Sequence, residues 1–149
     1  MKYIIKRFEK LTTNELYEIL KIRTKVFVVE QKCIYQDLDD KDKTSYHIIC
    51  YDNDKIVGYL RIIDKNISYN EIAIGRVLTA IEYRRKGIAT NLMKEAMTFI
   101  ENKLKEKTIK ISAQEYLIKF YENLGFKAIG EKYLEDDIPH VEMIYNNEK

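Results

Sequence analysis

A long amphipathic helix that begins directly after a basic turn is the feature that most constrains the fold. Its apolar positions recur every three or four residues, with charged residues between them: Ala89, Met93, Ala96, Ile100 and Leu104. This spacing predicts a helix with a single apolar face. Strand-like segments lie on both sides of it, at Glu71–Thr79 and Thr108–Ala113. A helix between two strands predicts an α/β or α+β domain.

Further strands and two shorter helices are predicted along the rest of the chain. The strands lie at Tyr3–Phe8, His47–Tyr51, Ile56–Ile63, Phe126–Tyr133 and Val141–Tyr145. One helix follows the N-cap signal Thr13-Asn14-Glu15 and continues to about Glu30, and the other spans Tyr116–Leu124 and ends at Gly125. The order β-α-β-β-β-α-β-α-β-β combines hairpins with crossovers, so we expect a mixed, mostly antiparallel sheet of about seven strands flanked by helices.

Length and composition favour one globular domain over residues 1–149. The chain has 26 Lys and Arg against 24 Asp and Glu, a net charge of +2. This balance is too even for a nucleic-acid-binding domain, so we expect no nucleic-acid partner. Two cysteines, Cys33 and Cys50, show no zinc-binding spacing, and we expect no metal. With no signal peptide and no apolar run long enough to span a bilayer, we expect a cytoplasmic protein that does not bind membranes.

The turn before the long helix has the chemistry of a phosphate site. Arg84-Arg85-Lys86 supplies positive charge, and Gly87 lets the backbone approach an anion closely. A helix N-terminus also offers unpaired N–H groups and a partial positive charge. The alternative is a basic turn that only caps the helix. The segment lacks the signatures of ATP and NAD sites.

Two motifs in this order resemble those of the GNAT N-acetyltransferases. The segment Arg84–Ala89 is similar to their acetyl-CoA pyrophosphate motif, Arg/Gln-x-x-Gly-x-Gly/Ala, and Phe120–Phe126 is similar to their Tyr-x-x-x-Gly-Phe segment. Four further segments resemble the ElaA-like branch: Val26–Gln31, Ile74–Val77, Ser112–Gln114 and Tyr133–His140. The resemblance covers about Phe8 to Met143 and implies a GNAT fold over the whole chain.

The resemblance implies that acetyl-CoA is the co-substrate and assigns residues to its binding. The main chain of Val77, Leu78 and Thr79 would pair with the pantetheine arm as an added strand does. The pyrophosphate would face the backbone N–H groups of the turn and first helical residues: Arg85, Lys86, Gly87, Ile88, Ala89 and Thr90. The side chains of Arg84 and Arg85 would add charge, and Gln114 stands where many members have a cofactor-contacting Asn.

Tyr121 is the predicted catalytic residue because of its position in the second motif that resembles the GNAT family. A phenol can protonate the CoA thiolate as it departs, and an N–H near Val77 or Leu78 could stabilise the oxyanion. The alternative for Tyr121 is a core aromatic packed with Leu117 and Leu124.

The general base that deprotonates the incoming amine stays open between four side chains. Glu30 and His140 are the leading candidates, and Glu71 and His47 are weaker ones. Each is also explained by a purely structural role.

The charge of the acceptor stays open, because two acidic loops and one arginine favour different substrates. One loop contains Asp37, Asp39, Asp40 and Asp42, and the other contains Glu135, Asp136 and Asp137. If both border the cleft they would favour a cationic amine, although both could be solvated loops, and Arg76 could instead bind an acidic acceptor.

We expect an enzyme that acetylates a primary amine of a small molecule. The alternatives are a protein acetyltransferase and an acyl-CoA-binding sensor without turnover. An exposed C-terminal edge strand would suit a homodimer.

Overall fold

All seven strands of the computed structural model, which describes residues 1–147, belong to one sheet of order β1-β2-β3-β4-β5-β7-β6. The strands are β1 (Lys2–Arg7), β2 (Ser45–Asp52), β3 (Lys55–Ile63), β4 (Ile72–Thr79), β5 (Thr108–Gln114), β6 (Lys127–Glu135) and β7 (Ile138–Asn146). Neighbouring strands are antiparallel except for β4 and β5. The expected mixed, mostly antiparallel sheet is therefore confirmed. β6 forms one edge of the sheet, and β7, the last strand, lies inside the sheet between β5 and β6.

The helices are α1 (Thr13–Arg23), α2 (Ile88–Asn102) and α3 (Ile118–Glu122). Short 3-10 turns lie at η1 (Phe8–Lys10), η3 (Lys41–Thr44), η4 (Ile81–Tyr83) and η5 (Glu115–Leu117), and η2 (Thr24–Glu30) is a π-helix. No helix within residues 1–147 is long and apolar enough to cross a membrane.

Two predicted helices differ in detail from the structure. The first ends its α-helical part at Arg23, and the turns to Glu30 are wider π turns, a geometry that often marks functional sites. Its N-cap is Thr12, one residue before the predicted signal, in a capping box with Glu15. The short helix predicted at Tyr116–Leu124 is divided between η5 and α3.

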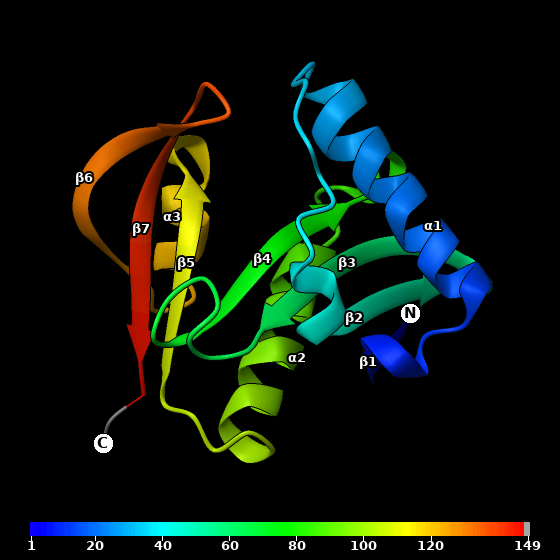
Figure 1. Cartoon of the computed structure of the whole chain (residues 1–149), viewed down its shortest axis with the longest axis horizontal. Helices are drawn as coiled ribbons and strands as arrows, with labels where there is room; N and C mark the ends of the chain where they lie inside the picture. Colours follow the sequence, from blue (N-terminus) through cyan, green and yellow to red (C-terminus); the bar gives the residue numbers. More distant parts are fainter. Residues whose placement is uncertain (148–149) are drawn as a thin grey trace.

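Helices cover both faces of the sheet, as Figure 1 shows. The alternation of side chains along β2 serves both layers. Ile48 and Cys50 pack in the cluster that contains α2, whereas Ile49 packs in the cluster that contains Ile19 of α1. Gly58 allows α2 to approach the sheet closely, since a Cβ there would lie 2.8 Å from Cγ2 of Ile88.

The separation of β4 from β5 creates the space for a site. The two parallel strands pair only at Ile72↔Ile109 and Ala73↔Lys110, and they then diverge (Figure 1). β4 continues to Thr79 with β3 on its other side. Within the described residues, β4 therefore has no strand partner on its β5 side beyond Ala73.

Candidate active site

Two adjacent hollows border the gap between β4 and β5. The first, which we call the α2 groove, has a volume of about 660 Å³ and lies around the start of α2. The second, which we call the sheet cavity, has a volume of about 520 Å³ and lies between β3, β4 and the β6–β7 turn. The two hollows share the lining residues Phe27, Gln31, Val77, Gln114, Leu117 and Tyr121. A molecule in the groove can therefore meet a molecule in the cavity at Tyr121.

The N-terminus of α2 opens into the groove without a side-chain cap. Gly87, with φ of +80°, is its N-cap residue, and the first helical bond of this turn runs from Asn91 N–H to the Gly87 carbonyl. The N–H groups of Ile88, Ala89 and Thr90 precede that bond and have no helical acceptor. All three residues line the groove, so unpaired donors and the positive end of the helix dipole face the same space.

The free edge of β4 supplies the second wall of the groove. Val77, Leu78 and Thr79 line it, in the part of β4 that has no strand partner on the β5 side. The register with β3 shifts between the pairs Arg61↔Gly75 and Tyr59↔Leu78, so Arg76, at φ of +54°, and Val77 form a bulge in β4. Bulges re-aim side chains next to functional sites, and an open strand edge can pair with an extended ligand.

Eleven of the twelve residues predicted to bind the cofactor line the α2 groove: Val77, Leu78, Thr79, Arg84, Arg85, Gly87, Ile88, Ala89, Thr90, Gln114 and Tyr121. Lys86 does not line the groove, and its Nζ lies 5.2 Å from the centre of the Tyr83 ring. Arg84 is held in place by two contacts, to the Thr79 carbonyl at 3.0 Å and to the Glu30 carboxylate at 2.6 Å.

Tyr121 is buried in the wall that both hollows share. It is 7 % exposed and packs edge-on against the rings of Phe120 and Phe126. Burial raises the pKa of its phenol well above the usual range, so Tyr121 carries its proton at neutral pH. This protonation state is the one that a proton donor needs.

Of the base candidates, only His140 lines the sheet cavity. Its Nδ1 lies 2.7 Å from the Ile138 carbonyl, which can only accept, so Nδ1 is the donor in this contact and Nε2 is the nitrogen left for other partners. Glu135 lies 3.6 Å from Nε2, and the ring of Tyr133 stacks on the imidazole. Tyr133 is in turn hydrogen-bonded to Ser112.

The other three base candidates lie elsewhere. Glu30 lines the α2 groove and is paired with Arg84. His47 is fully buried on β2, with Nδ1 at 2.6 Å from the Tyr59 hydroxyl and Nε2 at 2.9 Å from the Asp42 carbonyl. Glu71 precedes β4 and lines neither hollow.

The first acidic loop borders the sheet cavity through Asp39, but most of its charge is paired inside the fold, so it is not a solvated loop. Three of its aspartates, Asp37, Asp39 and Asp42, form a cluster with Arg23, Arg61 and Arg76. Arg23 is completely buried, and it bonds Asp37 at 2.9 Å and Asp42 at 2.7 Å. Only Asp40 points into solvent, with 94 % of its side chain exposed. Buried arginines need such partners, so this loop stabilises the fold.

Sequence reasoning missed the roles of Arg23 and Arg61. Both carried a signal, because Arg23 occupies an apolar position of the first predicted helix and Arg61 interrupts the apolar run Ile56–Ile63. A charged residue at a predicted core position predicts a buried partner of opposite charge. Arg76, which was considered as a residue that binds the acceptor, donates hydrogen bonds from Nε and Nη2 to Asp37.

The second acidic loop does border the cavity. Glu135 and Asp136 line it at the β6–β7 turn, whereas Asp137 does not. Residues 1–147 contain no group of His, Cys, Asp and Glu arranged to hold a metal ion.

A free strand edge and an uncapped helix N-terminus that lead to a buried, protonated tyrosine have the form of an acyl-CoA-dependent transferase site. The comparisons with known proteins agree: residues 11–146 match the family model described as an acetyltransferase (GNAT) domain. This chain belongs to the GNAT acetyltransferase family, in its ElaA-like branch.

Relatives are similar over nearly their whole length. A UPF0039 protein of Schizosaccharomyces pombe is 39% identical over 96% of this chain and 95% of its own. Protein ElaA of Escherichia coli is 36% identical over 90% of this chain and 89% of its own. An acyl-CoA N-acyltransferase structure from Pseudomonas aeruginosa has a TM-score of 0.91 at 36% identity, covering 97% of this chain and 99% of that one.

Proposed function

We propose that this protein transfers the acetyl group of acetyl-CoA to a primary amine of a small molecule. The observation that carries the proposal is the position of Tyr121, a buried and protonated phenol where the α2 groove meets the sheet cavity. The acetyl donor in the groove and the amine acceptor in the cavity would meet beside the Tyr121 hydroxyl. We also propose that the protein works in the cytoplasm, where Cys33 and Cys50 stay reduced, as the free thiols of both suggest.

Acetyl-CoA fits the α2 groove in two respects. Its pyrophosphate suits the free N–H groups of Ile88, Ala89 and Thr90, with Arg84 and Arg85 beside them. Its pantetheine arm suits the free edge of β4 at Val77–Thr79, because amide groups can pair with an unpartnered strand. When bound, acetyl-CoA supplies the thioester.

His140 is the proposed general base. With Nδ1 committed to the Ile138 carbonyl, Nε2 can take a proton from the incoming ammonium, and Glu135 stabilises the imidazolium that results. The freed nitrogen attacks the thioester carbonyl, and a β4 N–H near Val77 or Leu78 stabilises the oxygen anion. As the carbon–sulfur bond breaks, Tyr121 donates its proton to the departing thiolate. The nitrogen releases its second proton to solvent as the amide forms, the Tyr121 phenolate regains a proton from solvent, and the proton on His140 returns to solvent.

Release of free thiol from acetyl-CoA in the presence of a panel of primary amines tests the proposal. We expect amine-dependent thiol release together with a product heavier than the amine by one acetyl group. Acetyl-CoA binding without thiol release for any amine would instead support the non-catalytic sensor. Thiol release with peptides but not with small amines would support a protein acetyltransferase.

A further inference from the structure

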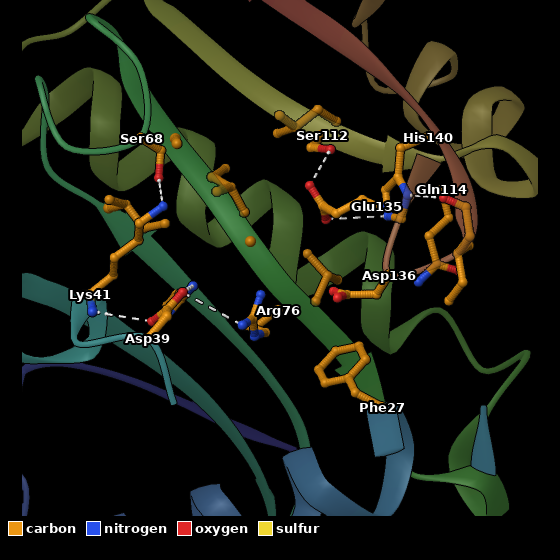
Figure 2. Close-up of a pocket in the computed structure, with 18 of the residues that line it drawn as sticks. Phe27, Asp39, Lys41, Ser68, Arg76, Ser112, Gln114, Glu135, Asp136 and His140 are labelled. Atoms are coloured by element: carbon orange, nitrogen blue, oxygen red, sulfur yellow. Dashed lines mark hydrogen bonds and ion pairs between the residues drawn. The ribbon is translucent and has the colours of Figure 1, made fainter. Parts of the chain in front are cut away.

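The sheet cavity carries opposite charge on its two walls. Figure 2 shows Lys41, Asp39 and Arg76 on one side of β4, and Glu135, Asp136 and His140 on the opposite side. The first wall belongs to the loop before β2 and to β3 and β4, and the second belongs to the β6–β7 turn. A ligand in the cavity therefore lies between two different electrostatic environments.

The arginine–aspartate cluster beneath the first wall is formally neutral. Its three arginines, Arg23, Arg61 and Arg76, are matched by Asp37, Asp39 and Asp42. Arg61 bonds Asp39 at 2.6 Å and Asp42 at 2.9 Å, so these carboxylates are already occupied. The cluster thus contributes donors to the cavity but no net charge.

Lys41 is the excess cation on this wall. Its Nζ donates to the Ser68 hydroxyl at 2.9 Å and has no carboxylate within 4.0 Å among the described residues. Two further donors, on residues that line the same cavity, are unused within residues 1–147. Nη1 of Arg76 makes no hydrogen bond, and Nε of Arg61 is buried without a partner. A buried donor without a partner is costly, so this wall has more donors than acceptors.

The second wall carries carboxylates that no lysine or arginine in the described part of the chain neutralises. Neither Glu135 nor Asp136 is paired with a lysine or arginine among the described residues. The carboxylate of Glu135 contacts only the Ser112 hydroxyl, at 3.5 Å, and His140 Nε2, at 3.6 Å, within residues 1–147. This wall lies beside Gln114, which pairs with His140 across β5 and β7 and lines both hollows. An ammonium group held here would lie next to the proposed base.

We propose that the acceptor is an amino carboxylate, with its amine at Glu135 and Asp136 and its carboxylate at Lys41 and Arg76. This inference rests on the proposed function, since it names the substrate class of the same site. One unbalanced lysine matches a singly charged carboxylate better than a doubly charged phosphate. The separation of the two walls selects the length of the spacer between amine and carboxylate.

Matched acceptors isolate the carboxylate. The panel contains L-amino acids and straight-chain ω-amino acids, each beside its own carboxamide, which keeps the size and the amine but removes the negative charge. We expect kcat/KM for the best amino acid to exceed that of its carboxamide by about 10- to 100-fold, the range for a hydrogen bond to a charged group. Phosphoethanolamine and short peptides complete the panel.

Variants of Lys41 test the assignment on the same protein. Lys41→Met keeps most of the side-chain length but removes the charge. We expect the ratio of kcat/KM for the amino acid to kcat/KM for its carboxamide to fall towards one. Lys41→Glu should reverse the preference in favour of diamines, a change that a purely structural role would not produce. Lys43→Met is the matched control, because Lys43 is 68 % exposed on the same η3 turn. Thermal unfolding and acetyl-CoA binding confirm that each variant is folded.

Binding to the CoA-loaded protein separates this inference from the proposed function. Carboxylate-dependent stabilisation without any thiol release would contradict acetyl transfer and support the amino carboxylate site. Turnover in which carboxamides equal or exceed their acids would overturn the amino carboxylate and leave acetyl transfer intact. A preference for phosphoethanolamine or for peptides, or equal binding of acid and carboxamide, would also overturn it.

Discussion

The Glu30 carboxylate accepts a hydrogen bond from the Arg84 guanidinium at 2.6 Å across the rim of the α2 groove. This contact joins the last residue of η2 to the turn before α2. Through this contact Glu30 helps to shape the α2 groove. His140, the other leading candidate for the base, lines the sheet cavity instead.

Substitution of the two base candidates should therefore have different kinetic effects. We expect His140→Asn to lower kcat by about 100-fold near neutral pH, because Asn can still donate to the Ile138 carbonyl but cannot accept the proton. The defect should shrink at high pH, where the amine loses its proton unaided. Glu30→Gln should change kcat by less than about 3-fold and raise KM for acetyl-CoA. A collapse of kcat in Glu30→Gln with unchanged KM would move the base to Glu30.

Removal of the Tyr121 hydroxyl should slow chemistry without weakening cofactor binding. We expect Tyr121→Phe to lower kcat by about 100-fold or more while the affinity for acetyl-CoA stays the same. Tyr116→Phe is the control, since Tyr116 also lines the α2 groove but is 73 % exposed. Steady-state kinetics at saturating acetyl-CoA provides the measurement, and an unchanged kcat in Tyr121→Phe would remove the proton-donor role.

The arginine–aspartate cluster should contribute strongly to stability. Asp42→Asn leaves the charges of Arg23 and Arg61 incompletely matched in a buried site, so we expect the free energy of unfolding to fall by about 3–5 kcal/mol. Asp40→Asn, on the same loop and exposed, should change it by less than about 0.5 kcal/mol. Urea unfolding at pH 7 measures both. Equal stability of the two variants would contradict the role of the cluster.

Stability should decrease in two stages as the pH falls. Burial lowers the pKa of His47 from its ordinary value of 6.5. Below about pH 6.5 the unfolded chain therefore binds a proton at His47 more readily than the folded chain does, and the free energy of unfolding decreases. Burial alone would raise the pKa of Asp42, but hydrogen bonds and charge from Arg23 and Arg61 outweigh it and hold the pKa below 3.8. Stability from Asp42 is therefore present above about pH 4 and lost below it.

Urea midpoints measured between pH 8 and pH 3 check this dependence. The variant His47→Gln should lack the stage near pH 6.5 and keep the acidic one. A wild-type midpoint that is constant between pH 7.5 and pH 5.5 would show that His47 is not held neutral by burial.

The close approach of α2 to the sheet should make Gly58 intolerant of a side chain. A Cβ there would lie 2.8 Å from Ile88 and 2.9 Å from Leu92, so we expect Gly58→Ala to destabilise by about 1–3 kcal/mol. Gly75→Ala is the control, because a Cβ at Gly75 meets nothing within 4 Å. Thermal unfolding of both variants measures the difference, and equal melting temperatures would be inconsistent with tight packing at Gly58.

Sequence patterns predicted the elements where the decisive interactions are local. The apolar spacing of Met93, Ala96 and Ile100 predicted the buried face of α2, and these residues are buried. Gly87 and its basic neighbours predicted a turn with free N–H groups, because capping involves residues only a few positions apart. The π turns of η2 were not predicted, because a π segment of seven residues is too short to show its own periodicity in the sequence.

The chain alone was enough to predict the order of strands and helices, the turn before α2 and the position of Tyr121 in its motif. These features depend on neighbours in the sequence. Tertiary structure decided that Asp37 pairs with Arg23 and Arg76, which are 14 and 39 residues away. It also decided that β4 and β5 separate beyond Ala73, and that the first acidic loop is neutralised while Glu135 and Asp136 line the cavity. Charge balance and burial depend on contacts between distant segments, and only the folded chain brings those segments together.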